Sequence, residues 1–139
     1  MREILFKAKC VYDGEWVEGY YLRDQYHRGG KDIIFYRKDS DWFTVYTDII
    51  DIETLCQFTG LCDKNGNKIW ENDILMAHLD ESYPEDATYE TVEWNVSGWV
   101  GHETGSTDRE YLDKFDLEHY EVVGNIFDNP ELLQEESDE

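Results

Sequence analysis

Three side chains that could bind calcium alternate along one short stretch of the chain. Asp63, Asn65 and Asn67 stand at the spacing of the first ligands of an EF-hand loop. Such a loop also needs glycine at its sixth position and glutamate at its twelfth, where this chain has Lys68 and Ile74. The mismatch argues against a calcium site.

Cysteine chemistry is the second candidate. Cys10, Cys56 and Cys62 are odd in number, and their spacing fits neither a redox CxxC motif nor a zinc knuckle. A nucleophilic cysteine needs a base, which the fold could supply from His27, His78, His102 or His119. No motif of a cysteine enzyme surrounds any of the three, so we expect buried, reduced thiols.

Two histidines adjoin acidic residues, in His78 to Glu81 (HLDE) and in His102-Glu103. A catalytic zinc needs three protein ligands at regular spacing, so we interpret both runs as solvated loops. The chain has 33 Asp and Glu residues, and among so many some pair lies at a glycosidase-like separation by chance. The sequence therefore predicts no catalytic residue, no metal site and no cofactor.

Tight-turn pairs divide the chain into short strands. Asn65-Gly66 is the pair that most readily takes positive φ at both central positions of a type I′ turn, which predicts a hairpin tip. Asp13-Gly14 predicts a second hairpin, between Val11-Tyr12 and Glu15 to Leu22. Apolar or alternating runs predict further strands over residues 33–36, 42–46, 74–78, 89–94, 98–102 and 120–127. This spacing is typical of a mostly β fold, a sandwich or small barrel.

Helix is the minor component of the predicted fold. Thr107 followed by Glu110 has the pattern of a capping box and predicts a short helix over residues 107–115. Asn129 before Pro130 predicts a capped turn near the end of the chain. Gly124 predicts a bulge or bend in the last strand. Residues 134–139 (QEESDE) have nothing to bury, and we expect them to be disordered.

Composition allows a core without disulfides or a metal. The chain is 40% hydrophobic and has 21 aromatic residues in a length of 139. For the C-terminal part we expect a core of large apolar residues in strand-like runs, namely Trp70, Ile74, Val92, Trp94, Val122 and Ile126. No run approaches the roughly 18 apolar residues of a membrane span, and the start MREILFKAK lacks the apolar segment of a signal peptide. We expect a cytoplasmic protein.

Charge is distributed unevenly along the chain. Residues 1–68 hold 12 acidic and 10 basic side chains, a net −2, within a total of −21. Residues 69–139 hold 21 acidic side chains and only two basic ones, Arg109 and Lys114, a net −19. Such a field repels nucleic-acid backbones and anionic membranes, and it attracts basic partners at rates that fall with salt. We therefore expect no direct binding to nucleic acid or membranes.

Three blocks carry a family resemblance: GEWVEGY at Gly14 to Tyr20, QFTGLCDKNGNKIWENDIL at Gln57 to Leu75 and EVVGNIFDNPELL at Glu121 to Leu133. In this order they resemble the YopX family, proteins encoded by phages and prophages, over nearly the whole chain. One departure is Asn72, where the family more often reads glycine. Asparagine tolerates the left-handed conformation well, so we expect the turn before Asp73 to persist.

The resemblance implies an architecture rather than a reaction. Proteins similar to YopX carry an SH3-like small barrel in the part that begins with the strand at Asn72 to Leu75. This implies a barrel region over residues 69–128, after an N-terminal β region over residues 1–68, in one domain over residues 1–133. The resemblance brings no catalytic residue with it and implies a place in the cytosol of a bacterial host.

Two classes of function follow. The first is a non-enzymatic phage or prophage accessory protein that binds a basic host or phage protein through an acidic face, unless the charge serves solubility alone. The residues expected on that face are Asp80, Glu81, Glu85, Asp86, Glu90 and Glu93. The second is a self-assembling structural or accessory module, a homo-oligomer that uses exposed aromatic side chains of the N-terminal half. An uncharacterised enzyme comes third, for want of a recognised motif.

Overall fold

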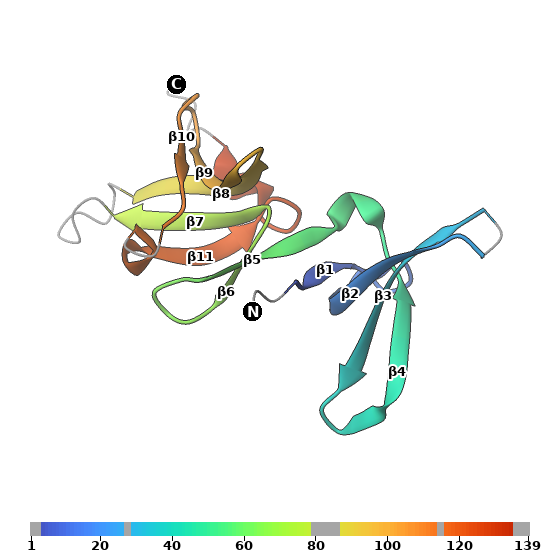
Figure 1. Cartoon of the computed structure of the whole chain (residues 1–139). Helices are drawn as coiled ribbons and strands as arrows, with labels where there is room; N and C mark the ends of the chain where they lie inside the picture. Colours follow the sequence, from blue (N-terminus) through green and yellow to red (C-terminus); the bar gives the residue numbers. More distant parts are fainter. Residues whose placement is uncertain (1–3, 27–28, 79–86, 114–115, 135–139) are drawn as a thin grey trace. The chain divides into compact units, whose positions relative to one another are not determined.

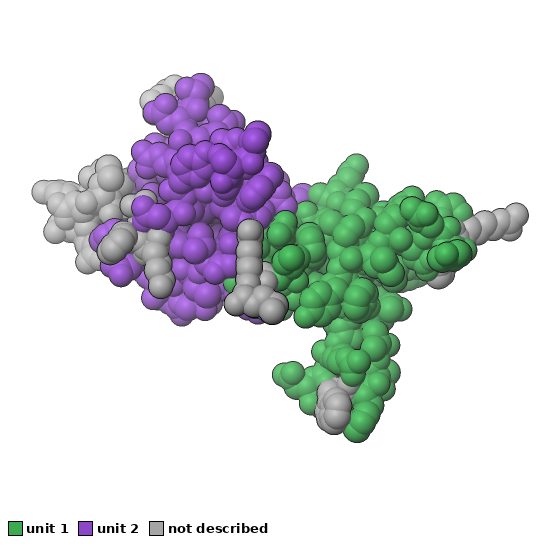
Figure 2. Space-filling view, in the orientation of Figure 1, with its two compact units in different colours: residues 1–58 green, residues 59–139 purple. Residues whose placement is uncertain are grey.

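The structure, a computed structural model, describes residues 4–26, 29–78, 87–113 and 116–134. From residue 135 on, the predicted tail lies outside the described residues. The chain divides into two compact units, residues 1–58 and residues 59–139, which Figure 2 colours green and purple. The division predicted from the sequence, between residues 68 and 69, lies further along the chain.

Unit 1 is built from antiparallel strands (Figure 1). They are β1 (Phe6–Lys9), β2 (Trp16–Asp24), β3 (Lys31–Lys38), β4 (Asp41–Ile49) and the start of β5 (Cys56–Cys62), with the 3-10 helix η1 (Ile52–Thr54) before β5. The sheet has the order β4-β3-β2-β1-β5-β6, in which β6 is Lys68–Trp70. The strands predicted over residues 33–36 and 42–46 are confirmed as parts of β3 and β4.

The hairpin predicted at Asp13-Gly14 is confirmed, since β1 and β2 pair on either side of it. Gly14 has φ +73°, and the Cys10 N–H donates to the Glu15 carbonyl oxygen at 2.9 Å. The predicted first strand, Val11-Tyr12, is wrong. These residues belong to the turn, because a bond of 2.9 Å from the Gly14 N–H to the Cys10 carbonyl closes the loop around them.

Strand β2 changes partner at its centre. Trp16 to Gly19 pair with β1, whereas Tyr20 to Asp24 pair with β3. A Cβ atom at Gly19 would lie 2.4 Å from the Phe35 carbonyl oxygen, so glycine alone lets β3 approach this closely. The core of unit 1 consists of the buried residues Ala8, Ile34 and Ile50 with the partly buried Phe6, Val17, Tyr21, Tyr36 and Leu55 around them.

The turn between β5 and β6 differs from the predicted type I′ geometry. Gly66 has φ +82°, but Asn72 is the one non-glycine residue with positive φ in the described ranges, so the prediction for Asn65 is wrong. The Gly66 N–H donates to the Asp63 carbonyl at 3.0 Å, and the Asp63 N–H donates to the Asn67 carbonyl at 2.9 Å. This pattern is that of a three-residue loop in which a left-handed glycine follows a type I turn. The Asp63 carboxylate stabilises it by accepting the N–H groups of Asn65 and Asn67.

Five strands form the sheet of unit 2. They are β7 (Asp73–His78), β8 (Ala87–Asn95), β9 (Gly98–Glu103), β10 (Arg109–Tyr111) and β11 (Tyr120–Asn125), in the order β10-β9-β8-β7-β11. The 3-10 helices η3 (Asp116–His119) and η4 (Pro130–Leu133) flank β11. In the described part of the chain β10 and β11 do not pair, so no closed barrel is formed. The fold is mostly β, as predicted, and the described residues contain no α-helix.

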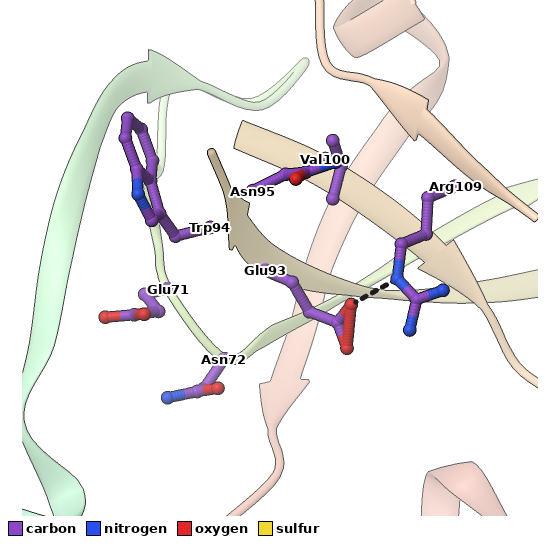
Figure 3. Close-up of a pocket in the computed structure, with 7 residues that line it drawn as sticks. All are labelled: Glu71, Asn72, Glu93, Trp94, Asn95, Val100 and Arg109. Carbon is purple, nitrogen blue, oxygen red and sulfur yellow. Dashed lines mark hydrogen bonds and ion pairs between the residues drawn. The ribbon is translucent and has the colours of Figure 1, made fainter. Parts of the chain in front are cut away.

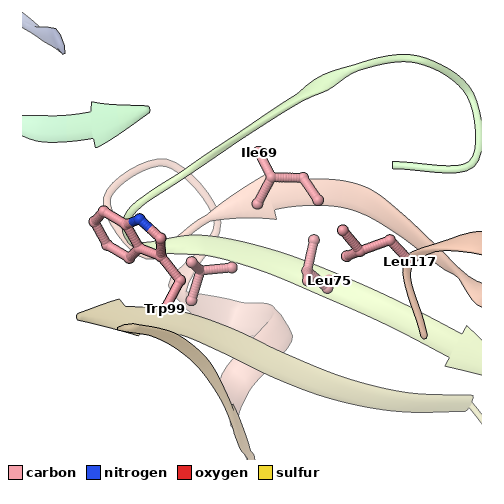
Figure 4. Packing of buried hydrophobic residues seen from close by; sticks show 5 residues of the cluster. Ile69, Leu75, Trp99 and Leu117 are labelled. Carbon is pink, nitrogen blue, oxygen red and sulfur yellow. The ribbon is translucent and has the colours of Figure 1, made fainter. Parts of the chain in front are cut away.

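The core of unit 2 gathers around Trp99 (Figure 4). Its buried residues are Ile69, Leu75, Val92, Trp99 and Leu117. Of the predicted core residues, Trp70, Ile74 and Val92 are buried, and Val122 and Ile126 are partly buried. Trp94 is 53% exposed, so its prediction is wrong. It stands at the end of β8 and pairs across the hairpin with Trp99, which fills the core in its place.

The helix predicted over residues 107–115 is also wrong. Arg109–Tyr111 forms β10, because pairing with β9 outweighs the weak capping signal of the sequence. Asn129 does precede the 3-10 turn of η4, but its side chain accepts the Asn125 N–H at 3.2 Å instead of capping the turn. The irregularity predicted at Gly124 is confirmed as a β-bulge against β7. Within the described ranges, no helix has the length and apolar character of a membrane span.

Candidate functional site

A cleft of about 600 Å³ opens on unit 2 (Figure 3). The residues that line it are Glu71, Asn72, Glu93, Trp94, Asn95, Val100 and Arg109. They come from the turn between β6 and β7, from the end of β8, and from β9 and β10. In the view of Figure 3, Trp94 and Glu71 lie on the opposite side from Arg109.

The turn from β6 to β7 fixes one wall of the cleft. Asn72 has φ +70°, which confirms the left-handed conformation expected there. Its N–H donates to the Val92 carbonyl at 2.8 Å, and its carbonyl accepts the Ile126 N–H at 3.1 Å. Backbone bonds from two other segments therefore hold Asn72 in place, and with it the neighbouring Glu71.

Glu93 is the centre of a charged group on the cleft. Its Oε2 accepts from Arg109 Nε at 3.1 Å, and its Oε1 lies 3.3 Å from His102 Nδ1. His102 Nε2 donates to the Ser106 carbonyl at 2.6 Å, because a carbonyl oxygen only accepts. The contact with Glu93 is thus a hydrogen bond only when the imidazole carries both protons. The side chains of Arg109 and Glu93 are 46% and 34% exposed, so their ion pair adds only about 0–1 kcal/mol and chiefly fixes the positions of the charges.

The indole of Trp94 is held in place by a second tryptophan. The Trp94 and Trp99 rings meet edge to face, with centroids 4.8 Å apart and an angle of 67° between their planes. Trp99 is anchored in the core, whereas about half of Trp94 faces solvent. A half-exposed indole with restricted motion is a suitable surface for a cationic side chain.

The cleft has the chemistry of a cation-binding site. The Glu71 carboxylate, the amide oxygens of Asn72 and Asn95, and the face of Trp94 are groups that ammonium and guanidinium ions prefer. A group of three or more metal-ligating side chains does not occur in the described part of the chain. The arrangement therefore suits recognition of a lysine or arginine side chain.

The acidic face predicted from the sequence is placed only in part, since Asp80, Glu81, Glu85 and Asp86 lie outside the described residues. Glu90 is 9% exposed, and its carboxylate lies so close to Gly101 that a Cβ there would be 2.7 Å from Oε2. Glu93 lines the cleft. The two stand three residues apart on β8 and so point to opposite faces of the sheet. The acidic face stays a prediction.

Sequence reasoning missed several members of the cleft. Glu71, Asn95 and Arg109 were not singled out as site residues, and Trp94 was assigned to the core. One signal was available, because residues 95–98 (NVSG) are turn formers that place Trp94 at the tip of a hairpin, close to solvent.

The other candidates have different roles. Asp63 is 7% exposed, and its carboxylate accepts the N–H groups of Asn65, Asn67 and Val122, each at 2.9 Å. Burial raises the pKa of Asp63, but these hydrogen bonds outweigh it and leave the pKa below its ordinary value. Asp63 is thus a structural carboxylate.

The thiols and histidines divide in a similar way. Cys10 and Cys56 are buried, as expected, whereas Cys62 is exposed and its prediction is wrong. His102 contacts Glu93 on the neighbouring strand. Of the segment from His78 to Glu81, only His78 lies within the described residues.

A solved structure shares the fold over nearly the whole chain. The crystal structure of protein EF1440 from Enterococcus faecalis superposes with a TM-score of 0.63 at 24% sequence identity, and the match covers 96% of this chain and 100% of that chain. At this identity the likeness concerns the fold alone. No curated protein matches the sequence.

The family comparison agrees with the resemblance seen in the sequence. The family model described as YopX protein matches residues 5–134. This range includes the three blocks from Gly14, Gln57 and Glu121, the left-handed turn at Asn72 and every lining residue of the cleft. The chain belongs to the YopX family.

Proposed function

We propose that this protein is a non-enzymatic accessory protein of a phage or prophage, which binds a basic host or phage protein through its acidic C-terminal half. The observation that carries the proposal is the cleft, where a half-exposed indole and the Glu71 carboxylate are available together. An arginine or lysine side chain of the partner stacks on Trp94 and pairs with Glu71.

Charge and cleft contribute at different ranges. The net −19 of residues 69–139 attracts a basic partner from a distance and speeds association, and salt weakens this attraction. Contact with the indole adds about 0.5–2 kcal/mol once the partner is seated. Long-range charge thus selects a class of partner, and the cleft selects a position on it.

The strand order of unit 2 supports an SH3-like arrangement for residues 69–128. Strands β7 to β10 form a meander, and β11 returns to pair with β7 after the 3-10 helix η3. In small barrels the connections between strands usually decide what is bound. The cleft is framed by two such connections, the turn at Asn72 and the end of the β8–β9 hairpin.

A titration with a fluorescent oligoarginine peptide tests the cleft. Trp94→Ala should weaken binding about tenfold, because it removes the cation–π contact, and Glu71→Gln should weaken it several-fold. Tyr26→Ala, at a fully exposed tyrosine of unit 1, and Glu118→Gln, which makes the same charge change on η3, are the matched controls. Both controls should bind nearly as well as the natural chain.

Equal losses for Glu71→Gln and Glu118→Gln would mean that only net charge matters and that the cleft is not the site. Binding that survives high salt would contradict the role of the acidic half. Recovery of partners from lysate of an infected or lysogenic host, identified by mass spectrometry, then shows which basic protein is bound.

A further inference from the structure

One sheet edge of this protein differs from the other three. In the described part of the chain the edge strands are β4, β6, β10 and β11. β6 and β10 have three residues each and β11 has six with a bulge, whereas β4 has nine. A long edge is a template for pairing with another chain, and proteins usually protect it with lysine, proline or a bulge. The sequence of β4, DWFTVYTDI, contains no lysine, arginine, proline or glycine.

An apolar face of the sheet continues to that edge. Strand register places Leu22, Ile33 and Ile49 in one row, and Tyr20, Phe35 and Thr47 in the next. Tyr20, Leu22 and Val45 are each about half exposed, and the Tyr20 and Phe35 rings lie 5.6 Å apart. The opposite face already supplies the core of unit 1 through Ile34. A contiguous apolar patch of this kind on solvent is typical of an interaction surface.

The β3–β4 hairpin also extends beyond its neighbours. Strand β2 pairs with β3 only as far as Tyr20 and Phe35, so the hairpin continues with two strands and projects from unit 1 as an arm (Figures 1 and 2). On one side of the arm Tyr36 and Tyr46 stack at 5.7 Å. Two-stranded ribbons are marginally stable by themselves in water. A third strand against β4 would stabilise the arm.

We propose that β4 is a dimer interface, at which the β4 strands of two copies of this chain pair antiparallel around a two-fold axis. Such an interface uses the same patch on both copies. Pairing centred on Val45 sets Asp41 of one copy opposite Ile49 of the other, and Asp48 opposite position 42, so no like charges face each other across the axis. The two apolar faces then form one surface.

Charge favours a second copy here over a basic protein. Residues 1–68 are nearly balanced at net −2, so two copies approach through unit 1 with little local repulsion. The apolar face offers a basic partner few carboxylates. The dimer is held by backbone hydrogen bonds and apolar contact, so its salt dependence is opposite to that of binding through the acidic half.

Sedimentation equilibrium of the full chain tests the interface. The natural chain should show a monomer–dimer equilibrium that strengthens with salt, because salt screens the repulsion between two copies of net −21. Val45→Lys places two ammonium groups together at the axis and should raise the dimer dissociation constant about tenfold or more. Val96→Lys is the matched control, at a valine 94% exposed on the β8–β9 turn, and should leave the constant unchanged.

A second variant protects the test against misfolding. Thr47→Lys changes an exposed polar residue of the same strand, and circular dichroism shows which variants keep the fold. A natural chain that stays monomeric in high salt overturns the proposal. So does a folded Val45→Lys or Thr47→Lys variant that dimerises as tightly as the natural chain, or an equal loss in Val96→Lys.

Discussion

The two units of this protein bury apolar residues in different ways. Unit 1 has a small core around Ala8, Ile34 and Ile50, and it leaves a second apolar face on solvent. Unit 2 encloses five larger residues around Trp99 and keeps its acidic side chains mostly outside. The contrast indicates two kinds of association, apolar and salt-resistant through unit 1 and charged and salt-sensitive through unit 2.

The largest expected effect separates the two tryptophans of the β8–β9 hairpin. Trp99→Ala should lower the free energy of unfolding by about 3–5 kcal/mol, because it opens a cavity in the core of unit 2. Trp94→Ala should cost less than about 1 kcal/mol, because the indole is half exposed. Trp99→Phe should cost far less than Trp99→Ala, since the buried Trp99 Nε1 has no acceptor among the described residues. Urea denaturation measures all three.

Hydrogen exchange shows whether this comparison between two cores holds. In Trp99→Ala the amides of β3 in unit 1 should keep their protection while those of β9 lose it. Loss of protection in both units would show that they unfold together, and the two cores would then count as one.

Acid and alkali should act on different units. The pKa of Asp63 in unit 2 lies below its ordinary value of 3.8, so the unfolded state binds more protons. Its stabilisation is complete above pH 3.8 and is lost as the pH falls through the lower, folded pKa. In unit 1, the hydrogen bond to Asp32 and then burial raise the pKa of Tyr21 above 10.0. That stabilisation is complete below pH 10.0 and is lost as the pH rises through the folded pKa.

Thermal melts followed by NMR in each unit measure this difference. Acid should loosen unit 2 first, and alkali should loosen unit 1 first. Tyr36 acts in the same direction as Tyr21, because burial and then its bond to Asp48 raise its pKa. Asp63→Asn should lower stability near neutral pH and flatten the acid limb, and Tyr21→Phe should flatten the alkaline limb. An acid limb unchanged in Asp63→Asn would contradict the role given to this carboxylate.

The smallest expected effect concerns the turn that carries one wall of the cleft. Asn72→Ala should cost about 1 kcal/mol, because alanine is disfavoured at φ +70°. Asn72→Gly should be nearly neutral, since glycine takes this conformation readily. The melting temperatures of the two variants decide the matter. Equal losses would show that the asparagine side chain, rather than its backbone conformation, is what the turn needs.

Local pattern predicted the strands well, because alternation and turn pairs act within a few residues. It failed for Trp94 and Trp99, which share a face and a hairpin pair. Their difference comes from Leu112 and Leu117, which pack on the core cluster from further along the chain. The helix over residues 107–115 failed for the same reason, since pairing with β9 overrides local propensity.

The cleft was harder to predict than the strands. Glu93 and Arg109 are brought together by the pairing of β8, β9 and β10, and Glu71 by a turn whose backbone is held from β8. None of these neighbours is visible in a short window of sequence. The single local sign that the sequence did give, asparagine in place of glycine at residue 72, concerned the backbone and was confirmed.

The position of β11 in the sheet governs the order in which the chain is completed on the ribosome. Unit 1 has all its strand partners once Gln57 has been added, whereas β7 must wait for β11. At about 5–20 residues per second, the interval from His78 to Asn125 is roughly 2–9 s. During this time Ile74 and Leu75, which are fully buried in the finished sheet, lack one of their strand neighbours. The carboxylates made in the same interval repel those of adjacent nascent chains, so the acidic half limits aggregation while its own sheet is still open.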